Sequence, residues 1–192
     1  MNDDTPTAER ELIAQARSGD ERAFAEIVRI HGDRVYRALR RFGLDADEAD
    51  DVAQEVFLRA WRGLGSFQER ARLSTWLYRI SFNEAQRRLA RRPPASAGRG
   101  PDDTDEVDRV PEDSLRGPQG RALDREFEAM LEGALAELPD DWRVAVILRD
   151  IEGLSTEEAA RVVGVRQAAF KSRLHRGRVQ LRSQLEHYLN PS

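Results

Sequence analysis

The residues best suited to catalysis are six carboxylates within eleven positions: Asp45, Asp47, Glu48, Asp50, Asp51 and Glu55. Such a cluster can hold a divalent metal ion for phosphoester cleavage. Most of these carboxylates fall at the start of a predicted helix, where the helix dipole favours negative charge in any protein. No histidine, lysine or serine stands beside them to act as a base or nucleophile. We therefore predict no catalytic residue, no metal site and no cofactor.

The histidine and cysteine content excludes further kinds of metal site and catalytic residue. The chain has no cysteine, which excludes disulfides, thiolate metal ligands and a cysteine nucleophile. The three histidines, His31, His175 and His187, are too scattered to suggest a zinc site. The N-terminus is acidic where a signal peptide would be basic, and the longest strongly apolar run is Val144 to Leu148. We expect a cytoplasmic protein without membrane insertion.

A stretch near the C-terminus concentrates positive charge. From Arg166 to Arg182 the chain carries six Lys or Arg residues and no Asp or Glu, although the net charge is −4. Helical spacing predicts a buried stripe of Phe170, Leu174, Leu181 and Leu185 and an outward side of Ala168, Lys171, Ser172, His175 and Arg176. A helix with one cationic side suits the major groove of DNA. The alternative is a solvated basic face on an ordinary helical hairpin.

A second face suited to nucleic acid is predicted on the helix that follows Ser74. Helical spacing brings an aromatic ring, amides and cations to one side: Trp76, Arg79, Asn83, Gln86 and Arg87. Such a side can bind phosphates and stack on unpaired bases. Arg88, Arg91 and Arg92 add positive charge beyond it. The alternative is a core tryptophan beside solvated arginines.

The helix that carries the acidic cluster has one apolar residue outside its buried stripe. Leu58 is surrounded on the helix surface by polar residues: Asp51, Gln54, Glu55 and Arg62. An apolar side chain ringed by polar ones is typical of a protein-binding face. The alternative is an isolated exposed leucine, which is common on protein surfaces.

Helices must position all of these residues, because both ends of the chain show helical spacing and no alternating strand pattern. Residues 93–121 hold five of the eight prolines, four glycines and seven acidic residues, with almost no core formers. We predict an all-α protein of two small domains. A helical bundle over 1–92 and a helix-turn-helix domain over 122–192 are joined by a disordered linker over 93–121.

Local signals place the helices of the first domain. Asp20 is a good N-cap for a helix that reaches Phe42, and Gly43 ends it. A short helix precedes it. The helix from about Ser74 cannot continue past Pro93.

The second domain has signals for a helix-turn-helix. A helix over about Asp140 to Ile151 ends at Gly153, and Ser155 to Glu158 has the form of a capping box. That short helix ends at Gly164, and a long helix follows to about Tyr188. Two helices joined by a tight glycine turn predict a helix-turn-helix.

The linker length suits two DNA sites on one duplex. A disordered segment of about 29 residues spans roughly 30 Å on average and about 100 Å when taut. One turn of DNA is about 34 Å. The two basic modules can therefore read sites one to about three turns apart.

Four segments together resemble the extracytoplasmic-function (ECF) sigma factors of the bacterial sigma-70 family. They are DEADDVAQEVFLRAWRGLGSF (47–67), STWLYRISFNEAQRR (74–88), LAELPDDWRVAVILRDIEGLSTEEAARVVGV (135–165) and KSRLHRGRVQL (171–181). They cover most of both domains in the family's order. The resemblance implies a promoter-recognition subunit, not an enzyme, whose partners are core RNA polymerase, promoter DNA and, in many relatives, an anti-sigma factor.

The resemblance also implies roles for individual residues. The core polymerase contact would comprise Asp51, Gln54, Glu55 and Leu58. The minus-ten element would be melted and read by Phe67, Trp76, Arg79, Asn83 and Arg87, with an unstacked base captured. The minus-thirty-five element would be read as duplex by Arg166, Gln167, Lys171, Ser172, His175 and Arg176.

Two segments depart from the usual family pattern. Residues 166–170 replace a proline or serine followed by Gly-Thr-Val at the start of the recognition helix, and Gln86 stands where an aspartate is common. We expect both departures to alter which promoter sequences are preferred. Neither departure removes a cationic face.

Three other functions also fit features of the sequence. A helix-turn-helix regulator acting without core polymerase predicts a dimer and a palindromic operator. A nuclease using the acidic cluster predicts magnesium-dependent cleavage, and a sigma-like adaptor predicts protein binding alone.

Overall fold

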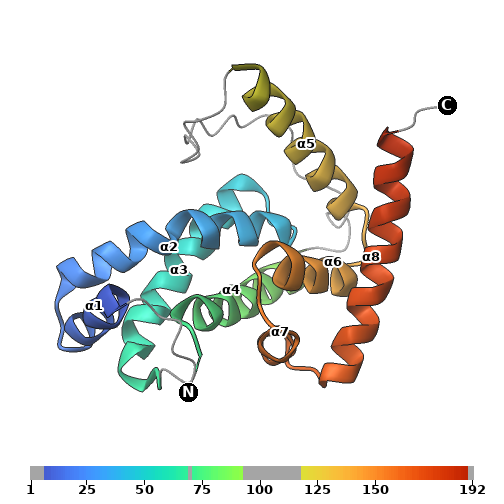
Figure 1. Cartoon of the computed structure of the whole chain (residues 1–192). Coiled ribbons are helices and arrows are strands. Elements are labelled where there is room, and N and C mark those ends of the chain that lie inside the picture. Colours follow the sequence, from blue (N-terminus) through green and yellow to red (C-terminus); the bar gives the residue numbers. More distant parts are fainter. Residues whose placement is uncertain (1–6, 69–70, 93–117, 190–192) are drawn as a thin grey trace.

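The computed structural model describes residues 7–68, 71–92 and 118–189, and every regular element within these ranges is helical. Most of the predicted linker, residues 93–117, lies outside the described residues. The next described element, helix α5, begins at Pro118, four residues before the predicted start of the second domain at residue 122. That domain boundary stays a prediction. The all-α class and the two helical domains are confirmed (Figure 1).

The N-terminal domain contains α1 (Thr7–Arg17), α2 (Glu21–Arg41), α3 (Ala46–Gly63), a short 3-10 turn η1 (Leu64–Ser66) and α4 (Leu73–Ala90). The Asp20 carboxylate caps α2 by accepting from the backbone N–H groups of Arg22 and Ala23, as the sequence predicted. Asp45 and Glu48 form a reciprocal capping box at the start of α3. Gly43 has a φ of 101°, which only glycine adopts without strain, and it ends α2.

The C-terminal domain contains α5 (Pro118–Ala136), α6 (Asp140–Val146), its π-helical continuation η3 (Ile147–Ile151), α7 (Thr156–Val163) and α8 (Gln167–Leu189). The predicted capping box opens α7, because Ser155 and Glu158 bond each other's backbone N–H groups. Gly164, with a φ of 71°, then turns the chain into α8. The helix-turn-helix therefore follows from local signals in the sequence.

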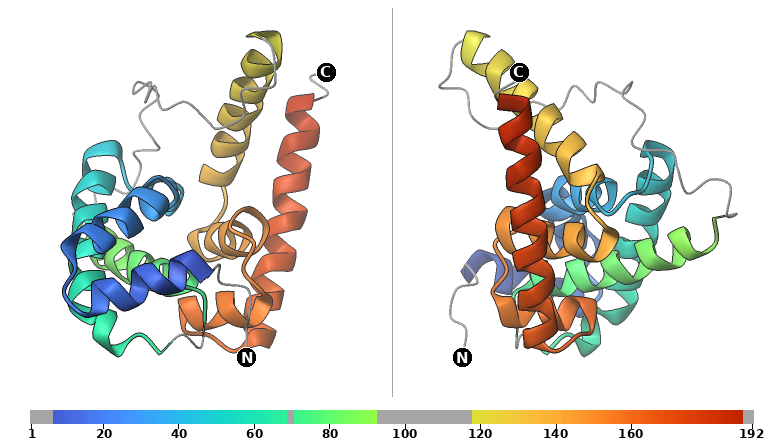
Figure 2. Two further views of the ribbon diagram at one scale, coloured as in Figure 1. Left: turned by 60° about the vertical axis from the view of Figure 1, so that its left-hand side comes forward. Right: turned by 90° about the vertical axis from the view of Figure 1, so that its right-hand side faces the viewer.

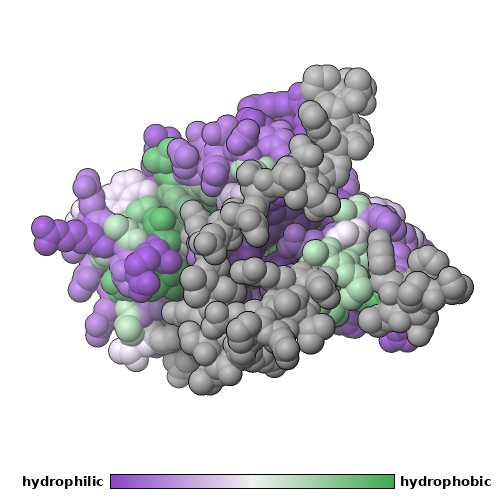
Figure 3. Space-filling view, turned by 90° about the horizontal axis from the view of Figure 1, so that it is seen from above, coloured by the Kyte–Doolittle hydropathy of each residue, from purple (hydrophilic) through white to green (hydrophobic). Residues whose placement is uncertain are grey.

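The two domains pack against each other. The buried apolar residues of both domains form one continuous cluster. Helix α7 contacts α4 on one side and α8 on the other, and α5 contacts α2. Figure 2 shows the C-terminal domain against the N-terminal one, with α8 on the outer side. Among the coloured residues of the surface seen from above, most are hydrophilic, and apolar patches lie toward the left and the right of the view (Figure 3).

None of the helices in the described ranges is long and apolar enough to cross a lipid bilayer.

Candidate functional site

Helix α8 presents the residues predicted to contact duplex DNA. Phe170 and Leu174 are buried against the rest of the domain, and this fixes which side of α8 faces outward. The six predicted residues are all exposed: Arg166, Gln167, Lys171, Ser172, His175 and Arg176. They share one end of the helix, next to the glycine turn, so a single surface can enter a groove.

Two of the six cationic side chains of this segment are engaged in ion pairs within the C-terminal domain. Arg173 forms an ion pair with Asp141 at 2.9 Å, and the Arg178 Nε donates to Asp150 at 2.9 Å. Both partners lie in α6 or η3, so these two arginines hold α8 to its own domain. The Arg176 guanidinium lies 5.9 Å from the centre of the Trp142 ring, and it remains exposed for DNA.

Helix α4 exposes three of the five residues predicted to contact the minus-ten element. Arg79 and Asn83 are exposed, and Arg87 is exposed while pairing with Glu84 at 2.8 Å. Arg59 of α3 shares the Glu84 carboxylate at 3.0 Å. The structure therefore brings Arg79, Asn83 and Arg87 to one open face, as helical spacing predicted.

Phe67 differs from the rest of that set because its side chain is only 7% exposed. Its ring packs 5.2 Å from that of the half-buried Trp76, and the Arg17 guanidinium lies 5.8 Å from its centre. Arg17 also donates to the backbone oxygens of Leu64 and Phe67. Sequence reasoning expected an available aromatic ring, whereas the fold encloses it, so Phe67 reaches a base only if this cluster opens.

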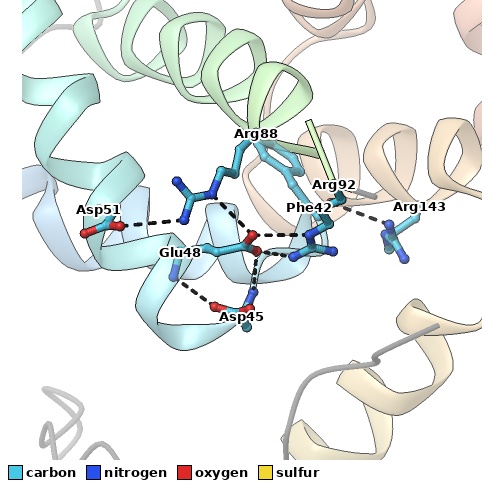
Figure 4. A network of polar contacts seen from close by, with 7 residues as sticks. All are labelled: Phe42, Asp45, Glu48, Asp51, Arg88, Arg92 and Arg143. Carbon is cyan, nitrogen blue, oxygen red and sulfur yellow. Dashed lines mark hydrogen bonds and ion pairs between the residues drawn. The ribbon is translucent and has the colours of Figure 1, made fainter. Parts of the chain in front are cut away.

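The basic tail of α4 also differs from the expectation of free positive charge. Arg88 and Arg92 both donate to Glu48 of α3, with Nε to Oε1 distances of 3.3 and 3.2 Å, and Arg88 approaches Asp51 at 3.7 Å (Figure 4). The hydrogen bond from Arg92, reinforced by Arg88, lowers the pKa of Glu48. These arginines hold the C-terminal end of α4 against α3. Two residues of the acidic cluster, Glu48 and Asp51, are therefore engaged in ion pairs.

The predicted protein-binding side of α3 is open. Asp51, Gln54 and Glu55 are exposed, and Leu58 is 49% exposed. Leu58 lines a groove between α2 and α3 whose lining combines apolar and charged side chains. Its apolar lining comprises Phe24, Val28, Tyr36, Ala53, Phe57, Leu58 and Trp61. Sequence reasoning missed the contribution of α2, although Phe24 and Val28 stand at helical spacing.

No metal centre forms from the acidic residues that the structure describes. Within the described ranges, no three His, Cys, Asp or Glu side chains converge as metal ligands would. Asp45 and Glu48 serve as caps and ion-pair partners instead.

Two family models match the chain, one to each domain. A model described as Sigma-70 region 2 matches residues 27–93, which span most of α2 through α4. A model described as Sigma-70, region 4 matches residues 128–181, from α5 into α8. The matched regions contain every residue that the sequence predicted to contact polymerase or DNA.

Whole-chain relatives agree with these matches. The chain is 36% identical to the RNA polymerase sigma-H factor of Pseudomonas aeruginosa, over 91% of this chain and 92% of the relative. It is 32% identical to the ECF RNA polymerase sigma factor SigW of Bacillus subtilis, over 92% and 96%.

The chain belongs to the ECF sigma factors of the sigma-70 family. The resemblance found in the sequence is thereby confirmed.

Solved structures show the same fold in relatives bound to other proteins. CnrH in complex with the cytosolic domain of CnrY superposes with a TM-score of 0.66 at 30% identity, over 93% of this chain and 97% of CnrH. The sigma factor RpoE of Bartonella quintana, in complex with the anti-sigma factor NepR, gives a TM-score of 0.64 at 25% identity, over 85% and 96%.

Proposed function

We propose that this ECF sigma factor directs core RNA polymerase to its promoters through three separate surfaces. The observation that carries the proposal is their distribution. Two cationic helix faces lie on different domains, and the exposed side of α3 around Leu58 lies beside an apolar groove on the N-terminal domain. A protein that bound only DNA would have no use for the third surface.

The α8 surface would read the minus-thirty-five element in the major groove. Arg166, Lys171 and Arg176 provide positive charge for phosphates and guanine edges, while Gln167, Ser172 and His175 offer hydrogen-bonding groups. Residues 166–170 depart from the common family pattern, so the preferred sequence is expected to depart as well.

The α4 surface would read the minus-ten element after the strands separate. Arg79 and Arg87 can follow the backbone, and Asn83 can bond a base edge. The Phe67 and Trp76 rings pack against each other at a tilt of 38°, and an unpaired base can stack on them once Phe67 is released. We expect DNA melting and this release to occur together.

The side of α3 that carries Asp51, Gln54, Glu55 and Leu58 would contact core polymerase. A half-exposed leucine beside an apolar groove supplies the centre of such an interface, and the carboxylates supply a polar rim. Binding of a polymerase helix in the groove between α2 and α3 would bury both.

The protein itself would have no active site, since polymerase supplies the phosphoryl chemistry. Its role requires it to work in the cytoplasm with polymerase and DNA. The two solved structures compared above are each bound to a protein partner, which in one of them is an anti-sigma factor. We propose that an anti-sigma factor also controls this chain.

The test is multi-round transcription by purified core polymerase on a promoter library, with and without the chain. We expect transcripts from a defined promoter subset only when the chain is present. Magnesium-dependent DNA cleavage, or operator binding by a dimer without polymerase, would contradict the proposal.

Two variants distinguish the α8 surface from the α3 surface. Lys171→Ala with Arg176→Ala is expected to reduce promoter use by at least about 10-fold, since each lost base or phosphate contact costs about 1–3 kcal/mol, while core binding persists. Leu58→Asp is expected to abolish core binding and leave the α8 surface intact. Arg37→Ala, an exposed cation of α2 that bonds only the Asp33 carbonyl among the interactions described, is the matched control. Equal effects of the first two variants on core binding would refute the division of labour.

A further inference from the structure

The short helix α1 reaches the aromatic rings proposed to receive a base of the minus-ten strand. Arg17, in the last turn of α1, donates from its Nε to the Leu64 carbonyl at 3.3 Å and from its Nη2 to the Phe67 carbonyl. The same guanidinium lies 5.8 Å from the centre of the Phe67 ring. One side chain therefore contacts both the backbone of the η1 turn and the ring that follows it.

Helix α1 is itself anchored in the N-terminal domain. Its residues Ile13 and Ala16 are buried in the core. The Glu9 carboxylate pairs with the buried His31 of α2 at 2.8 Å. Helix α1 thus lies against α2 and the η1 turn (Figure 1). Arg17 therefore extends to the turn from a helix whose position is fixed.

The Phe67 ring is enclosed by contacts from two elements. Besides the Arg17 guanidinium, the Trp76 ring of α4 packs 5.2 Å from it. Gly63 admits the Trp76 ring, since a Cβ at this glycine would lie only 3.3 Å from Trp76 Cζ2. Because Phe67 is only 7% exposed, an unpaired base cannot stack on its ring in this arrangement. Stacking requires the ring to be released.

Arg17 is the contact that a DNA strand can draw away. The residue is exposed, whereas Trp76 is half-buried. The two carbonyls that Arg17 binds are neutral, and a phosphate is a stronger acceptor for a guanidinium than a carbonyl is. A strand lying along Arg79 and Asn83 reaches Trp76 next, because the three residues share one side of α4. A phosphate of that strand can then take the guanidinium while a base takes the ring.

We propose that Arg17 is a positioning residue that keeps the Phe67 ring closed to DNA, and that the minus-ten strand must displace it before a base can stack there. Displacement adds an opening step to base capture. The apparent affinity for unpaired DNA is therefore reduced by the fraction of molecules in which the ring is released. A strand whose phosphate and base do not both fit gains too little to open the ring, so Arg17 also raises selectivity.

The part of this proposal that concerns DNA rests on the proposed function, whereas the closed position of the ring does not. Arg17 also stands before residue 27, where the match to the Sigma-70 region 2 model begins. The residues of α4 proposed to read the minus-ten strand lie within that match. The contact thus joins a helix outside the matched region to the proposed DNA surface inside it.

The first test measures whether Arg17 holds the turn, without any DNA. The chain has no cysteine, so Gln68→Cys places a single nitroxide label on an exposed residue next to Phe67. Its electron spin resonance spectrum should show an ordered label in the parent and a mobile label in Arg17→Gln. Arg22→Gln removes the same charge from an exposed position of α2. This matched control should keep the label ordered.

The second test measures the access of DNA to the ring. The probe is a fluorescein-labelled single strand of mixed sequence and about 12 nucleotides, within the usual site size of a single-strand-binding surface. By fluorescence anisotropy, Arg17→Gln should bind it at least about 5-fold more tightly than the parent, because loss of the charged hydrogen bonds raises the released fraction. Arg17→Lys keeps the charge but lacks the planar fork, so its affinity should lie between the two. Arg22→Gln should not tighten binding.

A third variant shows whether Arg17 acts through the ring. Phe67→Leu keeps an apolar side chain and removes the aromatic face. In this background, Arg17→Gln should no longer tighten binding of the single strand, since no ring remains to be released. A gain of the same size in the double variant would overturn the action through Phe67. Circular dichroism verifies that every variant remains helical.

The outcomes separate the role of Arg17 from the proposed function. An ordered label in Arg17→Gln overturns the positioning role, whatever the chain does with polymerase. A mobile label with unchanged or weaker binding of the single strand overturns the link to base capture, and weaker binding would instead make Arg17 a direct phosphate contact. If the chain gives no promoter-dependent transcription, the proposed function fails while the label still decides whether Arg17 holds the turn.

Discussion

At the scale of single residues, Gly177 decides how closely α8 approaches α6. It is buried in the middle of α8, and a Cβ there would lie 2.8 Å from the Val146 Cγ2 and 3.0 Å from the Trp142 carbonyl oxygen. Neither atom can move freely, because one belongs to a branched core side chain and the other to the backbone of α6. The glycine therefore permits the packing that orients the outward face of α8.

Gly177→Ala is expected to destabilise the protein by about 1–3 kcal/mol, because forced overpacking outweighs the better helix propensity of alanine. Thermal unfolding measures the effect as a lower Tm. Gly133→Ala is the matched control, since this glycine is helical and exposed with nothing near its Cβ position. The control should be neutral or stabilising by up to about 1 kcal/mol. A higher Tm for Gly177→Ala would contradict this account.

At the scale of elements, Glu48 joins the start of α3 to the end of α4. It completes the α3 capping box through the Asp45 backbone N–H and accepts hydrogen bonds from Arg88 and Arg92. The C-terminal turn of α4 is thereby held beside α3. The proposed polymerase contact lies on α3 itself. The junction at Glu48 therefore positions the open face of α4 relative to that contact.

Glu48→Gln is expected to cost about 1–3 kcal/mol at pH 7, the usual loss when a partly buried charged hydrogen bond is removed. Because the hydrogen bond from Arg92 lowers the pKa of Glu48, its stabilisation is fully present above the usual carboxyl pKa of about 4.3 and is lost as pH falls below it. The Tm difference between parent and variant should be constant from pH 7 to about 5 and shrink toward pH 3.

The exposed Glu55 on the same helix provides the comparison for Glu48. Glu55→Gln should change the Tm little at any pH, since surface carboxylates contribute at most about 1 kcal/mol. If the Tm difference between the parent and Glu48→Gln were the same at pH 3 as at pH 7, ionisation of Glu48 would not contribute to stability.

At the scale of the whole molecule, the distribution of charge matters more than its total. The net charge is −4, and Arg88, Arg92, Arg173 and Arg178 are engaged in ion pairs between helices. The exposed cations proposed to contact DNA lie on two separate faces, one on α4 and one on α8. Such a molecule is attracted to DNA only where those faces are presented together.

The isolated chain is therefore expected to bind promoter duplex weakly at physiological salt, with a Kd in the micromolar range or above, as for non-specific binding of about 10⁻⁴ to 10⁻⁶ M. Addition of core polymerase should tighten binding at least about 100-fold, because it holds both faces on one duplex. Fluorescence anisotropy with a labelled promoter measures both values. Nanomolar binding by the isolated chain would refute this dependence on polymerase.

Features that depend on neighbouring residues along the chain could be predicted without the structure. The caps at Asp20 and Ser155, the glycine stops at Gly43 and Gly164, and the outward side of α8 all follow from helical spacing and local hydrogen bonding. The family also followed, because its motifs are short contiguous segments in a fixed order. These features required no knowledge of how the helices pack.

Contacts between side chains far apart in the sequence could not be predicted, because they depend on how the helices pack. The tertiary structure enclosed Phe67 behind Trp76 and Arg17, engaged Arg88 and Arg92 with Glu48, and formed the groove between α2 and α3. It also placed Glu152 among residues 74 to 118 positions away in the chain. Helical spacing shows which side of a helix is polar, but an ion pair between helices and a solvated charge look alike in sequence, because only packing determines whether a partner is near.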